Sequence, residues 1–128
     1  MASYLSLLVI IISIVTVISG LTQVIAPDLV LGFIGASVTA TSMHFFAIVG
    51  MFMALFGGMM LHAVYSAYPN HVAILWAAFQ KLGAFLAVGL GVFHDIFSLL
   101  ALGVAFFDLF SGLLFLYYLK TLRHRENH

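Results

Sequence analysis

The chain has 128 residues, of which 65% are hydrophobic and only 6% are charged, and its mean hydropathy is +1.25. This composition lies far outside the range of soluble domains and indicates an integral membrane protein, because so few polar side chains cannot cover a water-exposed surface. Four Lys and Arg residues balance four Asp and Glu residues, so no basic surface indicates nucleic acid as a partner, and the absence of cysteine excludes disulfides and thiolate metal sites.

Four stretches of the chain are long and apolar enough to cross a bilayer, which takes about 20 residues each. They cover about residues 3–26, 42–64, 72–93 and 97–119. Pro27 closes the first stretch, Ser42 is expected to cap the second, and the turn residues of the YPN segment separate the second from the third. We predict an all-α fold: an integral membrane four-helix bundle forming a single domain over residues 1–128, with a short C-terminal tail.

The first predicted helix carries a weakly polar stripe of Ser13, Thr16, Gly20 and Gln23, at steps of three, four and three residues. This spacing places the four residues on one helix face, which we expect to turn toward the bundle. The connector that follows, residues 28–41, is too short to cross the bilayer and too apolar for a free loop. It is expected at the membrane interface or tucked against the bundle, with an ordinary linker as the alternative.

Small residues recur every three or four positions along the second and third predicted helices. Such rows let two helix backbones approach closely where no hydrophobic effect drives association. The spacing does not say whether the partner is this chain, a second copy or another subunit, although packing within the chain is favoured. The rows are Gly50, Ala54 and Gly57 in the second helix and Gly83, Ala87 and Gly91 in the third.

Lys81 interrupts the apolar third helix about 13 Å from its starting end, and Asp108 lies at a similar depth in the fourth helix. The two helices are joined by a short turn, so they are expected to be antiparallel neighbours whose two charges meet. A single charge at this depth costs about 2.5–3.5 kcal/mol, which favours pairing.

The predicted pair has two interpretations. In the first, favoured one, it holds the register of the third and fourth helices, supported by Gln80 and Ser111. In the second, it lines a proton or substrate path or anchors a polar headgroup.

Six histidines raise the hypothesis of a haem b held by two imidazoles, with His44 and His94 on one side of the membrane as its candidate ligands. Histidines at helix ends more often anchor a helix at the headgroup level, so we expect no cofactor. No nucleophile–base pattern, phosphate-binding loop or metalloprotease motif is present in the sequence, and an enzyme is not expected.

The basic residues Lys120, Arg123 and Arg125 follow the fourth helix directly, whereas Asp28 and Asp95 belong to the opposite side. By the positive-inside rule this places the C-terminus in the cytoplasm, and an even number of helices places the N-terminus there too.

Three segments together resemble the DoxX-like group of small four-helix bacterial membrane proteins: SGLTQVIAPD, HFFAIVGMFMALFGG and KLGAFLAVGLGVF. The resemblance implies a compact bundle in a bacterial inner membrane with an accessory role, and it carries over no catalytic residue. Small multidrug transporters resemble the chain less, because the first helix lacks their essential carboxylate.

We therefore expect a non-catalytic accessory or scaffold subunit that contacts membrane lipid and packs against a membrane protein partner or its own copies. The first alternative is a small proton-coupled carrier that uses Lys81 and Asp108. The second alternative is an electron-transfer subunit that binds haem b.

Overall fold

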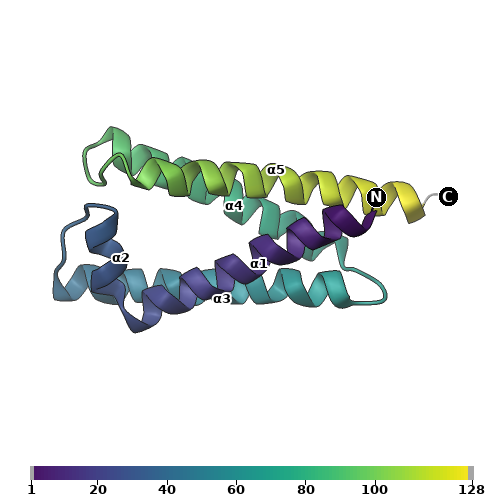
Figure 1. Cartoon of the computed structure of the whole chain (residues 1–128), viewed down its shortest axis with the longest axis horizontal. Coiled ribbons are helices and arrows are strands. Elements are labelled where there is room, and N and C mark those ends of the chain that lie inside the picture. Colours follow the sequence, from purple (N-terminus) through teal and green to yellow (C-terminus); the bar gives the residue numbers. More distant parts are fainter. Residues whose placement is uncertain (1, 127–128) are drawn as a thin grey trace.

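A computed structural model describes the backbone of residues 2–126 and the side chains of residues 4–125. Its helices, in chain order, are α1 (Ala2–Ile25), α2 (Pro27–Phe33), α3 (Ala40–Tyr65), α4 (His71–Phe93) and α5 (Ala101–Glu126) (Figure 1). The described residues form no strand, and the four long helices have the length and apolar composition needed to cross a membrane. The predicted all-α fold with four membrane-spanning helices is confirmed.

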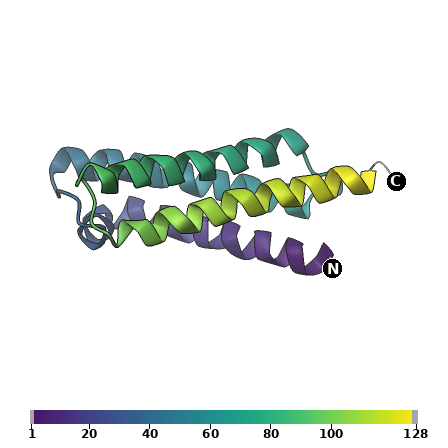
Figure 2. The same cartoon turned by 90° about the horizontal axis from the view of Figure 1, so that it is seen from above.

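The long helices form two pairs. α1 packs mainly on α3, and α4 packs mainly on α5, while contacts between the pairs are fewer. Figures 1 and 2 show that both chain termini lie at one end of the bundle, and that α2 lies at the opposite end. α1 therefore begins at the end of the bundle where α5 finishes, and the two helices run in opposite directions.

Two apolar clusters fill the interior. The larger one joins all four long helices and includes Val9, Met60, Ile74 and Phe115, each no more than 2% exposed. The smaller one lies under α2, where Leu31 and Ile34 pack with Ala101. Between them the interior is polar, since Ser13, Thr16, Lys81, Asp108 and Ser111 are all buried.

Glycines let α1 and α3 meet backbone to backbone. A methyl group at Gly20 would collide with the Gly50 carbonyl oxygen, and one at Gly50 would collide with the Gly20 carbonyl oxygen. A methyl group at Gly57 would likewise meet the Ser13 carbonyl oxygen and Val17. The second-helix row therefore packs inside the chain, against the predicted polar stripe of α1, which is buried.

The connector after α1 contains α2 and folds against the bundle. Gly35 ends α2 with φ at 73°, a left-handed conformation that glycine adopts without steric cost, and the Ala36 amide donates to the Leu31 carbonyl. The Ser98 amide donates to the Ile34 carbonyl at 2.7 Å, which ties this connector to the α4–α5 turn.

The start of α3 differs slightly from the prediction. Thr39, rather than Ser42, is the N-cap residue. Ser42 is the third residue of the helix, and each of the two hydroxyls accepts a hydrogen bond from the backbone amide of the other residue, which forms a capping box. The helix thus begins at Ala40 because the hydroxyls of both residues satisfy backbone amides of the first turn.

The fourth span begins later and ends later than residues 97–119. After α4 the Asp95 amide donates to the Val92 carbonyl and the Ile96 amide to the Gly91 carbonyl, with Asp95 at a φ of 60°. This helix-ending motif turns Phe97 back onto Gly91, so α5 starts only at Ala101. At its other end α5 continues through the basic residues to Glu126, where a non-helical tail is expected from the sequence.

The row on α4 is split in two. Gly91 is buried against Phe97, but Gly83 and Ala87 are exposed, and nothing lies within 4 Å of a methyl group placed on Gly83. The contact within the chain that the sequence favours is therefore absent at Gly83. The reason is helical phase: Lys81 points inward, and Gly83 lies about 200° around the helix from it at 100° per residue.

Candidate functional site

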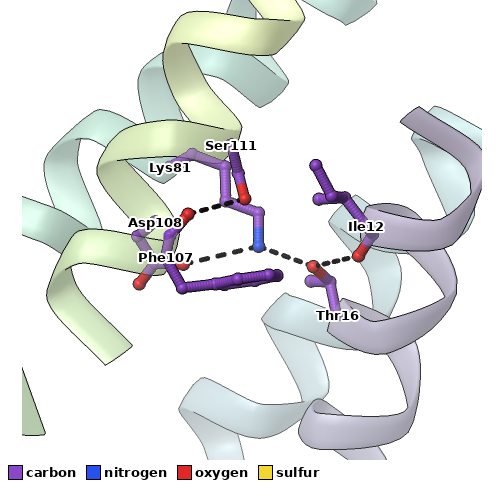
Figure 3. Close-up of polar contacts among 6 residues, drawn as sticks. All are labelled: Ile12, Thr16, Lys81, Phe107, Asp108 and Ser111. Atoms are coloured by element: carbon purple, nitrogen blue, oxygen red, sulfur yellow. Dashed lines mark hydrogen bonds and ion pairs between the residues drawn. The ribbon is translucent and has the colours of Figure 1, made fainter. Parts of the chain in front are cut away.

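Lys81 lies inside the bundle at the junction of the two helix pairs. It is 3% exposed and projects from α4 into the space between α1 and α5 (Figure 3). On α4 it follows the buried Ala77 and Ala78, whose small side chains leave room for the other helices to close over it. The ammonium group is thereby removed from both water and lipid.

The Lys81 ammonium has three neighbours on two helices. Its Nζ donates a hydrogen bond to the Thr16 hydroxyl of α1 at 2.5 Å. It lies 3.5 Å from Oδ1 of Asp108 on α5 and 5.4 Å from the centre of the Phe107 ring. The sequence-predicted partners Lys81 and Asp108 are thus brought together, at the distance of an ion pair rather than of a short hydrogen bond.

Thr16 is a partner that the sequence reasoning missed. Its hydroxyl donates to the Ile12 carbonyl at 2.8 Å, which leaves an oxygen lone pair to accept the hydrogen bond from the Lys81 ammonium. The signal was present, since Thr16 belongs to the polar stripe of the first helix. The pairing could not be assigned because the sequence does not say which helix faces α4 across the bundle.

The two predicted supporting residues, Gln80 and Ser111, both lie near Lys81 but make different contacts. The Ser111 hydroxyl is fully buried but donates to the Phe107 carbonyl of its own helix at 2.7 Å. The hydroxyl proton of Ser111 is therefore used within α5 and is not donated to Asp108. Gln80 lies beside the small space next to Lys81.

The polar cluster is closed. The space next to Lys81 is bounded by residues of all four long helices, and it leaves no room for a water molecule. Its walls are the polar side chains of Ser13, Thr16 and Gln80 together with apolar residues such as Met60 and Phe115. The Lys81 and Asp108 side chains are 4% and 11% exposed, and each charge is offset by the other, as is common for charges within a membrane span.

The candidate haem ligands lie outside this cluster. His44 is in the first two turns of α3 and His94 caps α4, and both imidazoles are exposed. A haem held between helices needs imidazoles directed into an apolar interior. The side chains of residues 4–125 also form no group of three or more His, Asp or Glu residues that could hold a metal ion.

What the cluster can do chemically follows from its composition. A lysine, an aspartate and a threonine hydroxyl, enclosed without a substrate-sized space, can hold three helices in one register. The charge of Lys81 on α4 contacts α1, which belongs to the α1/α3 pair, and also α5, which belongs to its own pair. In comparisons with known proteins, no family model, no curated protein and no solved structure matches the chain.

Proposed function

We propose that this protein is a non-catalytic accessory or scaffold subunit of a membrane complex, which binds a membrane protein partner or a second copy of itself through α4. The proposal has two parts. The interior holds the bundle together, and the outer face of α4 receives the partner helix. Each part is supported by a different set of residues.

The observation that carries the proposal is the exposed pair of small residues on α4. Gly83 and Ala87 lie one turn apart on a surface that touches nothing in the chain at Gly83, whereas the corresponding glycines of α3 are buried against α1. In a membrane a small-residue pair at this spacing lets a second helix approach to backbone contact. The small residues of α3 are therefore covered by α1, whereas Gly83 and Ala87 of α4, which we call the open row, stay exposed.

The test is the substitution Gly83→Leu, with Gly58→Leu as its matched control. Both glycines are exposed, and neither has an atom within 4 Å of an added methyl group, but Gly58 lies on α3. Purification in mild detergent, followed by mass spectrometry of the intact assembly, should show the partner or second copy with the wild type and with the Gly58 variant, and its loss with the Gly83 variant. A second variant, Ala87→Leu, should reproduce that loss.

A monomer for all four proteins would contradict the proposal, and so would an unchanged assembly in both α4 variants. Insertion into the membrane is checked separately by the yield of folded protein. Since the substituted positions face outward, the substitutions should leave the fold of the single chain intact.

The carrier alternative rests on the presence of two charges within the membrane span. The absence of room for a water molecule beside Lys81 supports the structural interpretation over this one. Substrate-dependent proton flux in liposomes would favour the carrier over the structural interpretation. A Soret band in the purified protein would do the same for the haem alternative, which the exposure of His44 and His94 disfavours.

We also propose the bacterial inner membrane as the location and membership of the DoxX-like group, as the sequence resemblance implies. The three basic residues Lys120, Arg123 and Arg125 support a cytoplasmic position for both termini. A reporter fused after residue 128 tests this orientation. If a reporter that is active only outside the cytoplasm shows activity there, the proposed orientation is wrong.

A further inference from the structure

A pocket opens at the end of the bundle where the chain termini lie. It has a volume of about 740 Å³ and lies between the start of α1 and the last turns of α5. α1 contributes Leu5 and Ser6, and α5 contributes residues that include Tyr117, Lys120, Thr121 and Arg125. The α5 residues recur at three- and four-residue steps, so one helix face lines the pocket.

The pocket lies at the boundary between the hydrocarbon and the headgroups. α5 has 26 residues and is therefore about 39 Å long at 1.5 Å per residue, whereas the hydrocarbon core is about 30 Å thick. The excess length lies at the basic end, since Leu119 is followed by Lys120. Tyr117 is 57% exposed one turn before Lys120, at the level where aromatic side chains prefer the interface.

The two ends of the pocket differ in chemistry. On the membrane side of the α5 cations its wall includes the ring of Tyr117, and Leu5 of α1 adds an apolar side chain. Further along α5, toward the end of the bundle, it carries the cations of Lys120 and Arg125 and the hydroxyl of Thr121. Ser6 and His124 also line it, and none of its described lining residues, within the side chains of residues 4–125, is a carboxylate. A phospholipid has the same order of groups, with an apolar chain beneath and a phosphate above.

Charge distinguishes this end of the bundle from the other one. Three of the four Lys and Arg residues of the chain lie in the last turns of α5, whereas Asp28 and Asp95 are exposed at the end where α2 lies. An arginine binds a phosphate with two parallel hydrogen bonds, and basic residues beside a span attract anionic lipid.

We propose that this pocket binds the headgroup phosphate of an anionic phospholipid, with Arg125 and Lys120 as the cationic contacts and Leu5 and Tyr117 against the glycerol and upper acyl chain. The site lies on α1 and α5 and includes no residue of the open row on α4. It is therefore independent of the proposed partner surface.

The experiment compares lipids on the intact protein. Purified protein in mild detergent receives either phosphatidylglycerol or phosphatidylcholine, and native mass spectrometry counts the retained lipid. The wild type should retain phosphatidylglycerol preferentially. Arg125→Gln and Lys120→Gln should each lower that retention about fivefold, the effect of one basic residue near an anionic headgroup.

Arg123→Gln is the matched control, because it removes the same charge from the same exposed turn at a residue that does not line the pocket. It should change the retention of phosphatidylglycerol less than about twofold. An equal loss in all three variants would overturn the proposal in favour of unspecific attraction by the basic end of α5. Equal retention of the two lipids by the wild type would overturn it as well.

A third arm separates a lipid from a free anion. Inorganic phosphate at millimolar concentration should not displace phosphatidylglycerol, because the apolar wall adds contacts that the free ion lacks. Full displacement would mean that the pocket holds a soluble anion instead of a lipid. Melting temperatures in neutral detergent should be equal for the wild type and the three variants, since every substituted side chain is exposed.

Discussion

The two helix pairs are held together by different means. In the α1/α3 pair, Gly20 and Gly50 bring the two backbones together, so that a single added carbon atom at either residue meets a carbonyl oxygen of the other helix. In the α4/α5 pair, the nearest atoms to such a carbon at Gly112 belong to the Leu82 side chain. The second pair also carries the buried charges, and Lys81 reaches across to Thr16 of the first.

This difference shows what a row of small residues does and does not specify. Small residues recur at three- or four-residue steps in both α3 and α4, yet Gly50 and Gly57 pack inside the chain whereas Gly83 faces outward. The row permits a close approach, but the inward direction of each helix is set elsewhere. In α4 it is set by the charge, because Lys81 must face the interior to meet Asp108.

The largest effect is expected from breaking the ion pair that distinguishes the second helix pair. Lys81→Met leaves Asp108 buried without its cation, and Asp108→Leu does the same to Lys81, so each should destabilise the protein by about 3–5 kcal/mol. The double variant should recover much of the loss, because the desolvation cost disappears with both charges. Thermal unfolding in detergent of the wild type and the three variants measures the coupling directly.

Additive losses in this cycle would show that the two side chains do not depend on each other. In that case the 2.5 Å contact with Thr16 would be the main support of Lys81. The buried charge would then hold α4 to α1 of the α1/α3 pair, and it would no longer account for the contact between α4 and α5.

A smaller but still large effect is expected at the glycine contact of the first pair. Gly50→Ala places a carbon atom against the Gly20 carbonyl oxygen and should cost up to about 3 kcal/mol through overpacking. Gly58→Ala, on the same helix, meets no atom within 4 Å and should leave the stability unchanged or raise it by up to about 1 kcal/mol through helix propensity. Unfolding in detergent should therefore show a loss for the Gly50 variant and no loss for the Gly58 variant, and a stabilised Gly50 variant would refute backbone contact.

The parts of the structure that could be predicted from the sequence are those set by the bilayer. Span length follows from its thickness, and the meeting of Lys81 and Asp108 follows from equal depth in adjacent helices. The inward stripe of α1 follows from helical period. In each case one physical constraint acts on one or two neighbouring helices.

The remaining features depend on contacts between distant segments. The start of α5 at Ala101 depends on Phe97 packing on Gly91, and the bond between Lys81 and Thr16 joins residues 65 positions apart. Gly112, which receives Leu82, belongs to no row in the sequence. Spacing within one helix carries no information about such partners.

The smallest effect tests the link between the pairs, with two threonines of α1 as a matched set. Thr16 and Thr22 both donate to the carbonyl four residues earlier at 2.8 Å, but only Thr16 also accepts a hydrogen bond from Lys81. Replacing each with valine removes the same local bond and preserves the shape. Thr16→Val should therefore cost about 1.5 kcal/mol more than Thr22→Val, the contribution of a hydrogen bond to a charged group.

The same substitution carries a second expectation within the Lys81→Met background. There the ammonium is absent, so the difference between the two threonine variants should vanish when their unfolding in detergent is measured. A difference that persists would mean that Thr16 acts through its packing against the neighbouring helices. A difference that disappears assigns the effect to the hydrogen bond by which Lys81 of the α4/α5 pair holds Thr16 of the α1/α3 pair.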